Sequence, residues 1–514
     1  MEGCASMRLH NSLRNSIAVM IQMTVTMIIS FFSRRIFIQV LGIEYQGLNS
    51  LFTSIITILS VAELGIGSAI VYNMYQYIAK QDAETIKSLM NLYKKCYRYT
   101  AAIIFVVGLC LLPFISLFAG YHDIYENLYV IFLLFLSDAI FSYLFSYKRA
   151  ILSAHQENYI VNLFDLLYVV LLNVVQISIL LITKNFIYFL GIRIILRLIE
   201  NIGINFVANK KYPYLKSRDI EMLDKGIVKK IFEQMKGLIF HRIGGIFVVG
   251  IDSIIITRFL GIAVMGLYSN YVMVVSAIST ILYQIVKSSV ASVGNLLTEK
   301  NSEKSFNIYK KLSFFSFWIY SFATVSIYLM MEPFITIWLG EEYLLSRYIL
   351  LTIIGNFYIQ GLRSPMNVFK DAAGIFYEDR YIPIVESIIN LSLSLVLVNL
   401  LGLSGILIAT IISTMILFGY SYPKYVYSPL FKKRKIDYFK EQILYLVILL
   451  FIFICTVTIS GMFQTSGIWM NLFINLLVCL VIPNTLCFII FRKKAEFVYF
   501  KKIFFKIIVL KHTK

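Results

Sequence analysis

Seven arginines lie inside long apolar stretches of the sequence, where a charged side chain is costly. On insertion scales each costs at least about 2.5–3.5 kcal/mol at the centre of a bilayer, so such residues usually face a cavity or a charged partner. Arginine suits phosphate because its planar guanidinium group forms two charge-assisted hydrogen bonds at once. These residues therefore point to a site for an anionic, phosphate-bearing group. They are Arg34, Arg35, Arg193, Arg197, Arg242, Arg258 and Arg363.

Arg193, Arg197 and Glu200 are the strongest candidates among them and their neighbours. Their spacing of i, i+4 and i+7 puts all three on one helical stripe near the middle of the stretch 186–208. The alternative is a structural ion pair between Arg197 and Glu200, which would leave Arg193 without a partner. Arg242 begins the stretch 237–260, where it would receive a pyrophosphate group from the inner leaflet or contact lipid headgroups.

The other arginines lie closer to the ends of their stretches. Arg34 and Arg35 are roughly 10 Å from the outer end of the first stretch at 1.5 Å per residue. Because they are adjacent, they point about 100° apart, so at most one can face straight into a cavity. A substrate-binding role and contact with headgroups both remain open for this pair. Arg258 and Arg363 are expected to reach the headgroups from span ends.

Six carboxylates also occur in these stretches. Asp252 is central in its stretch, and Glu63 precedes Gly65, where a helix can bend. Either could carry H⁺ or Na⁺ in a coupled cycle, or balance the charge of the arginines. Asp138 and Asp165 are expected to be structural hydrogen-bonding groups. The six are Glu63, Asp138, Asp165, Glu200, Asp252 and Glu386.

The composition places these residues in a polytopic membrane protein. The chain has 514 residues, of which 59% are hydrophobic and 15% charged, and its mean hydropathy is +0.78. A soluble domain carries about 25% charged residues. We expect an all-α protein with fourteen transmembrane helices and a retained first span. The spans are 16–41, 47–71, 98–119, 127–147, 159–182, 186–208, 237–260, 264–286, 312–333, 345–367, 381–400, 403–423, 441–461 and 468–491.

The basic residues predict the orientation. Of the 47 Lys and Arg residues, 38 fall in alternate loops and the two tails, and two fall in the opposite loops. The positive-inside rule then puts both termini in the cytoplasm. This distribution accounts for the net charge of +19 without nucleic acid. The basic tail, 492–514, is expected to contact anionic lipids.

The chain also repeats itself. Three short segments recur at offsets of 219, 216 and 220 residues, each at the same element of its half. Because each half has six spans, the two halves enter the membrane in the same direction, which is a transporter architecture. A substrate site is expected between two parallel six-helix bundles. The expected domains are 1–208, a linker 209–236, 237–426, two further helices in 427–491 and the tail 492–514.

The pattern resembles a known family. The run Phe32-Ser33-Arg34-Arg35-Ile36-Phe37-Ile38-Gln39-Val40-Leu41-Gly42, followed by Gly47-Leu48 and Ala62-Glu63-Leu64-Gly65-Ile66-Gly67, resembles the N-terminal signature of Wzx-type polysaccharide repeat-unit flippases. These belong to the multidrug/oligosaccharidyl-lipid/polysaccharide exporter superfamily. The resemblance implies a bacterial cytoplasmic membrane protein. It would move undecaprenyl-pyrophosphate-linked oligosaccharides to the outer leaflet by ion-coupled alternating access. This step precedes polymerisation into O-antigen, as in lipopolysaccharide, or into capsule.

Other functions remain open at this point. A multidrug/cation antiporter is expected to show an acidic or apolar cavity, which the arginines oppose. A lipid II flippase of the same superfamily would have nearly identical physics. A membrane-embedded glycosyltransferase or polymerase would need catalytic groups on a large outer loop, and the outer loops are short. No nucleotide-binding, metal or catalytic motif is found, so neither enzymatic activity nor a cofactor is expected. Whether a polysaccharide polymerase binds as a partner is left open.

Overall fold

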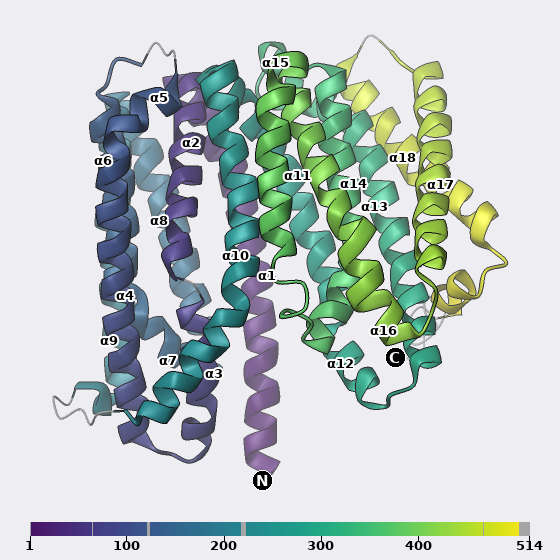
Figure 1. Ribbon diagram of the computed structural model, residues 1–514. Helices are drawn as coiled ribbons and strands as arrows, with labels where there is room; N and C mark the ends of the chain where they lie inside the picture. Colours follow the sequence, from purple (N-terminus) through teal and green to yellow (C-terminus); the bar gives the residue numbers. More distant parts are fainter. Residues whose placement is uncertain (1, 64, 121–123, 217–222, 466, 503–514) are drawn as a thin grey trace. The chain divides into compact units, whose positions relative to one another are not determined.

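The computed structural model of the protein describes residues 2–63, 65–120, 124–216, 223–465 and 467–502, without the side chains of 2–13, 15–17, 230, 234–243 and 247–249. Over this part of the chain every regular element is a helix, which confirms the all-α prediction (Figure 1). The helices divide into two compact units, residues 1–266 and 267–514. The domain boundaries expected from the repeat stay a prediction.

The first unit is a bundle of long helices with two short ones. Helix α1 packs along α8, helices α6 and α8 both pack on α9, and α10 packs on α2. The helices are α1 (Glu2–Leu41), α2 (Ile43–Leu59), α3 (Ile66–Ala79), α4 (Ala83–Leu111), α5 (Ile115–Ala119), α6 (Leu128–Phe145), α7 (Arg149–Ala154), α8 (Asn158–Thr183), α9 (Phe186–Lys211) and α10 (Lys225–Leu260).

The second unit is centred on α13, which packs against α14 and α18. Helix α11 starts at the end of the first unit and continues into the second. The helices are α11 (Ile262–Lys287), α12 (Val290–Thr298), α13 (Ser302–Trp338), α14 (Arg347–Ala373), α15 (Ile382–Ile416) with a π-helical continuation (Leu417–Tyr427), α16 (Ser428–Phe431), α17 (Lys435–Met462) and α18 (Ile468–Phe491).

The outer faces of many helices are apolar, as a bilayer requires. Leu171 on α8, Val447 on α17 and Val481 on α18 are 51%, 57% and 55% exposed. Extended apolar surface of this kind is rare on soluble monomers. The helices satisfy their own backbone hydrogen bonds, so such faces can lie against acyl chains. The chain is a polytopic membrane protein.

Nine helical segments in the described part of the chain are long and apolar enough to span a membrane, and the number is ten if the bent pair Ile43–Glu63 and Ile66–Ala79 counts as one span. Helices occur at all fourteen predicted ranges. One reason for the lower number is charge, because every 18-residue stretch of α9 contains at least three charged residues. The count of fourteen spans stays a prediction.

A second reason is that α15 contains two antiparallel helices. Asn390 donates a hydrogen bond to Thr410 at 3.0 Å, although a straight helix would separate them by about 30 Å. Gly402, with φ 58° and ψ −136°, breaks the helix at the turn. A Cβ atom on Gly405 would lie 2.1 Å from the carbonyl oxygen of Leu397, so the chain folds back very tightly.

The internal repeat returns as two matching turns. Gly42 joins α1 to α2 with φ 97° and ψ 173°, and Gly261 joins α10 to α11 with φ 95° and ψ 160°. A positive φ favours glycine at both places because glycine has no Cβ atom. The two positions are 219 residues apart, as in the sequence match.

The same repeat positions meet inside the first unit. A Cβ atom on Gly47 would lie 2.0 Å from the carbonyl oxygen of Ile262, and one on Gly266 would lie 2.3 Å from that of Ile43. Positions 43 and 262 are repeat equivalents, and so are 47 and 266. The contact is therefore reciprocal, and its closeness depends on the two glycines, as is common where membrane helices approach.

The starts of α4 and α13 are capped alike. The Asp82 side chain accepts a hydrogen bond from the backbone N–H of Thr85, and the Asn301 side chain accepts one from that of Lys304. The hydrogen bonds from Thr85 hold the pKa of Asp82 below its usual value. The two caps are 219 residues apart, so they differ by three residues, almost one turn, from the 216-residue match inside these helices.

We predict that Gly47→Ala destabilises the protein. The added methyl group would overlap the backbone of Ile262, and overpacking costs typically about 1–3 kcal/mol. The check is the thermal midpoint of the detergent-purified protein, which should fall by several degrees. Gly191→Ala in α9 is the matched control, because nothing lies within 4 Å of a Cβ atom there. Equal midpoints for the two variants would contradict the close contact.

Candidate functional site

The arginine stripe of α9 faces the neighbouring helices α6 and α8. Asn185 fixes the start of α9, because its side chain accepts hydrogen bonds from the backbone N–H groups of Ile187 at 2.8 Å and Tyr188 at 3.2 Å. From that start, Arg193 and Arg197 reach the packed side of the helix. The predicted stripe is thus present in the structure.

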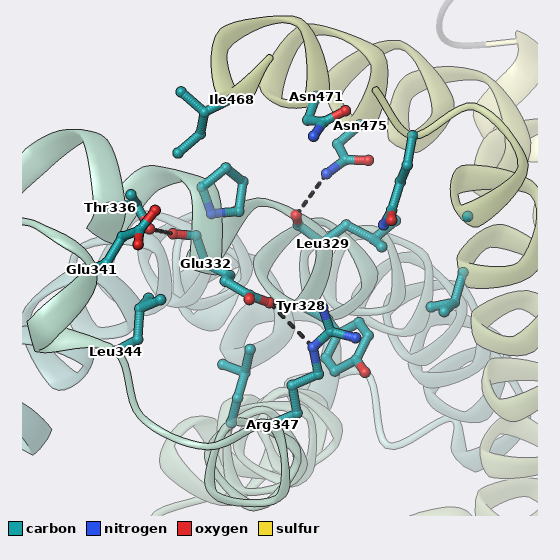
Figure 2. A pocket seen from close by; sticks show the side chains of 15 residues that line it. Tyr328, Leu329, Glu332, Thr336, Glu341, Leu344, Arg347, Ile468, Asn471 and Asn475 are labelled. Atoms are coloured by element: carbon teal, nitrogen blue, oxygen red, sulfur yellow. Dashed lines mark hydrogen bonds and ion pairs between the residues drawn. The ribbon is translucent and has the colours of Figure 1, made fainter. Parts of the chain in front are cut away.

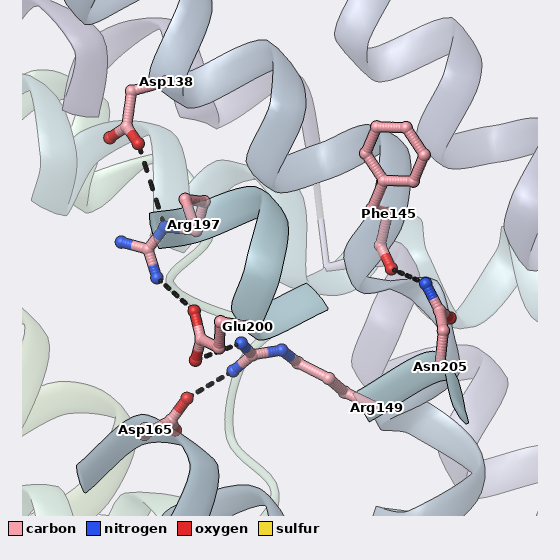
Figure 3. Close-up of polar contacts among 7 residues, drawn as sticks. All are labelled: Asp138, Phe145, Arg149, Asp165, Arg197, Glu200 and Asn205. Atoms are coloured by element: carbon pink, nitrogen blue, oxygen red, sulfur yellow. Dashed lines mark hydrogen bonds and ion pairs between the residues drawn. The ribbon is translucent and has the colours of Figure 1, made fainter. Parts of the chain in front are cut away.

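An ion-pair network joins α6, α7, α8 and α9 (Figure 3). Asp138 lies 2.9 Å from Nε of Arg193 and 3.8 Å from Nε of Arg197. Glu200 lies 3.0 Å from Nη1 of Arg197 and 2.7 Å from Nη2 of Arg149. Each arginine in the network therefore has a carboxylate partner.

Two expectations about pairing can now be compared with the structure. The Arg197–Glu200 ion pair is present. The expectation that Arg193 lacks a partner is wrong, because Asp138 on α6 reaches it. Spacing along α9 could not reveal this carboxylate, which comes from a different helix. Asp165 does more than form a neutral hydrogen bond, since its Oδ1 lies 2.5 Å from Nη1 of Arg149.

Arg149 is the functional candidate that the sequence analysis missed. It was counted with the cytoplasmic segment 148–158. The short helix α7 instead turns it inward, so that it bridges Asp165 on α8 and Glu200 on α9. A signal was available, because two carboxylates inside spans need a cationic partner.

The guanidinium groups are the more accessible part of the network. The side chains of Arg193, Arg197 and Arg149 are 29%, 22% and 23% exposed, whereas Glu200 is 3% and Asp138 9% exposed. The Arg197 guanidinium also lies 4.0 Å from the ring centroid of Tyr168, a cation–π distance. The carboxylates and the ring therefore hold the arginines from the buried side.

The remaining predicted residues lie elsewhere in the first unit. Arg34 is half-buried and Arg35 exposed on α1. Arg242 belongs to α10, but its side chain lies outside the described residues. Asp252 is buried on α10, next to Ser253, whose hydroxyl accepts a hydrogen bond from Ser54 on α2 at 2.9 Å. These residues are not brought into the network by any contact described above.

Glu63 lies at the bend between α2 and α3. Its carboxylate accepts a hydrogen bond from the Tyr97 hydroxyl at 3.1 Å, and Tyr97 accepts one from Tyr93 at 2.6 Å. A Cβ atom on Gly67 would come within 2.6 Å of the Tyr93 hydroxyl and 3.2 Å of the carboxylate, so this glycine makes room for the chain. The bend expected beside Glu63 measures 42°.

The second unit has its own buried ion pair. Arg363 does not reach the surface as expected, because its side chain is 17% exposed and lies 3.9 Å from Glu386. Its Nε also donates to the Tyr422 hydroxyl at 3.1 Å. Glu386 accepts a further bond from Thr414 at 3.0 Å. Among the described residues no cluster of His, Cys, Asp and Glu could hold a metal ion.

The comparisons with known proteins support one family and one fold. The profile of a family described as polysaccharide biosynthesis protein matches residues 12–291. No curated protein sequence is significantly similar to the chain. Among solved structures, the lipid II flippase MurJ in an inward closed conformation gives a TM-score of 0.65 at 16% identity, over 93% of this chain and 98% of that one.

Two multidrug transporters are similar as well. An inward-facing MATE family transporter of the MOP superfamily gives a TM-score of 0.62 at 15% identity, over 82% of this chain and 99% of that one. A mutant of the Vibrio cholerae MATE transporter VcmN gives 0.56 at 14% identity, over 85% and 100%. At such identities the similarity shows the fold alone.

The family match and the fold agree with the sequence resemblance. Helices of the first unit carry the N-terminal signature, and the match covers all of the residues in the ion-pair network. The fold is the one found in transporters of the MOP superfamily. Because the matched region is more than half of the 514 residues, the chain belongs to the polysaccharide biosynthesis protein family.

Proposed function

We propose that the protein is a flippase for undecaprenyl-pyrophosphate-linked oligosaccharides, which it moves from the inner to the outer leaflet of the bacterial cytoplasmic membrane by alternating access. Family membership and the transporter fold support this function. The observation that carries it is the set of three guanidinium groups, of Arg149, Arg193 and Arg197, on the accessible side of a network inside the spans. Arg242, Arg34 and Arg35 are proposed to assist along the path.

The geometry suits a pyrophosphate group. Arginine offers five N–H donors, and Arg193 directs only its Nε toward Asp138 in the network. Its terminal nitrogens are then available to phosphate oxygens. A pyrophosphate in hydrocarbon would otherwise pay a prohibitive desolvation cost. Guanidinium groups held in place by carboxylates behind them are ordered before the substrate arrives.

The network is balanced, so substrate binding must exchange partners. Three arginines face three carboxylates, and the formal charges cancel. We propose that phosphate oxygens replace Asp138 at Arg193 and Arg197. The displaced carboxylate would be buried, and it is then neutralised by a proton or a cation. This exchange links substrate binding to ion coupling, in which Glu63, Asp252 and Glu200 are further candidates.

The alternatives differ in substrate. A lipid II flippase would use the same arginines, since its substrate also carries a pyrophosphate. A multidrug/cation antiporter is opposed by the geometry, because the cationic ends of the network are accessible and Asp138 and Glu200 are buried. Cytoplasmic termini, anionic lipid contacts and a polymerase partner remain proposals from the sequence.

We predict that deletion of the gene leaves full-length repeat units on the lipid carrier, trapped on the cytoplasmic side. The measurement is mass analysis of lipid-linked intermediates, with protection from an enzyme added outside to report the side. Accumulation of lipid II would favour the lipid II flippase. Unextended carrier would point to a transferase and would overturn the proposal.

We predict that Arg197→Ala abolishes surface polysaccharide while the protein still inserts. Two or more charge-assisted bonds to phosphate are lost, at about 1.5–3 kcal/mol each, which corresponds to about a ten- to hundredfold slower flux or more. Surface polysaccharide is measured against the amount of protein in the membrane. Arg258→Ala, exposed near the end of α10, is the matched control and should leave the polysaccharide normal.

A paired variant separates substrate binding from a purely structural role. Removing one partner of a buried ion pair is strongly destabilising, whereas removing both is often nearly neutral. Asp138→Asn combined with Arg193→Gln keeps the charge balance. Normal polysaccharide in this variant would mean that the pair only locks α6 against α9. Loss of polysaccharide at a normal protein level supports substrate binding.

We predict that Glu63→Gln makes transport independent of a proton or sodium gradient. The amide still accepts the hydrogen bond from Tyr97 but cannot bind and release a proton. Flux of a lipid-linked oligosaccharide in proteoliposomes, with and without each gradient, is the measurement. Tyr97→Phe keeps the carboxylate and should retain the gradient dependence. If Glu63→Gln retains it too, Glu63 is structural and the coupling residue is another carboxylate.

A further inference from the structure

The second unit contains a cavity of about 700 Å³ between the ends of four helices (Figure 2). Its walls come from the C-terminal part of α13, the start of α14, the end of α17 and the start of α18. The volume lies in the range of small-molecule sites, about 300–1,000 Å³. The distribution of basic residues predicts that these helix ends face away from the cytoplasm.

The lining of the cavity is polar although its helices are mostly apolar. Eight of its fifteen residues have polar side chains. On α18 the two asparagines, Asn471 and Asn475, are spaced i and i+4, so they lie on the same side of the helix. Polar residues in a span are expensive and usually mark a site or a structural lock. Both purposes can be separated here from the contacts.

The asparagines form the fixed part of the wall. Asn475 donates to the carbonyl oxygen of Leu329 on α13 at 2.9 Å and accepts from Ser460 on α17 at 2.6 Å. Asn471 holds the turn between α17 and α18 through hydrogen bonds with Thr465. These bonds fasten α17 and α18 to α13, so the cavity keeps its shape without a ligand.

Other polar groups remain available to a ligand. Glu341 and Gln464 are exposed at the cavity, and no ion pair is found for Glu341 among the described residues. Tyr328 is half-buried, with its ring held 4.8 Å from that of Phe453. A carboxylate, a planar amide and an aromatic ring therefore surround one space.

The single guanidinium group in the wall is already paired. Nη2 of Arg347 lies 3.1 Å from Glu332 Oε2, and its Nε donates to the same oxygen at 3.2 Å. With Glu341 added, the lining has a net formal charge of −1. A phosphate group would thus meet no unpaired cation and one carboxylate. The ligand must be neutral or carry an amine.

We infer that this cavity binds the glycan part of an oligosaccharide, neutral or amine-bearing. Hydroxyl groups both donate and accept, which matches a wall of carboxylate, amide and hydroxyl groups, and the Tyr328 ring offers an apolar face. The volume accommodates a few sugar units of a larger chain. The inference rests on the proposed function for the choice of glycan, but its residues are distinct from the ion-pair network of the first unit.

Binding of a glycan without a carrier lipid tests the inference. The probe is the oligosaccharide repeat unit released by acid from the surface polysaccharide of the producing cells, so it has no pyrophosphate. Its affinity for the full-length protein in nanodiscs is measured by calorimetry. Glu341→Ala combined with Gln464→Ala should weaken binding about tenfold or more, because two hydrogen bonds are lost. Both residues are exposed, so the variant should fold.

The controls separate this site from the proposed transport path. Glu342→Ala removes a neighbouring exposed carboxylate that does not line the cavity, and it should bind like the natural protein. Arg197→Ala should also bind the free glycan normally. No binding by the natural protein, or equal binding by the double variant, would overturn the inference. Normal surface polysaccharide in Arg197→Ala with weak glycan binding in the double variant would refute the proposed transport path and leave this site intact.

Discussion

Compensation of charge inside an apolar environment is the constraint on which the first unit depends. Arg149, Arg193 and Arg197 can stay inside the spans because carboxylates from three other positions reach them. Breaking one such pair leaves an uncompensated charge and costs about 3–5 kcal/mol, a large share of a protein's stability. The network therefore fixes how α6, α7, α8 and α9 pack, and it explains why the chain forms the short helix α7 instead of a loop.

The sequence predicted what depends on order along the chain. Apolar stretches gave the helices, and the i, i+4, i+7 spacing on α9 gave the stripe, because a helix fixes which residues share a face. The recurring glycines at 42 and 261 gave the repeat, since their positive φ angles demand that residue type. The glycines beside Glu63 indicated a bend. Each of these properties is local, or is repeated in the sequence.

The sequence could not predict which side chains meet across helices. Asp138 pairs with Arg193 although 55 positions separate them, and Arg149 enters the network from a segment that the charge pattern assigned to the cytoplasm. In the same way Arg363, close to a span end, turns to Glu386 instead of the headgroups. A long side chain near a span end can reach in either direction, and only the neighbouring helices decide. Packing, not spacing, sets these pairs.

A lipid-linked oligosaccharide presents two chemically different parts, and the two units differ in the same sense. The pyrophosphate needs cations that can leave their own partners, and the accessible arginines of the first unit offer them. The glycan needs many weak donors and acceptors without net positive charge, and the cavity near Tyr328 offers those. One site could not serve both parts well, because an unpaired guanidinium that binds phosphate would itself be costly to bury against sugar. Separate recognition of the two parts also lets each bond break in turn, so that the substrate is released without paying the whole cost of dissociation in one step.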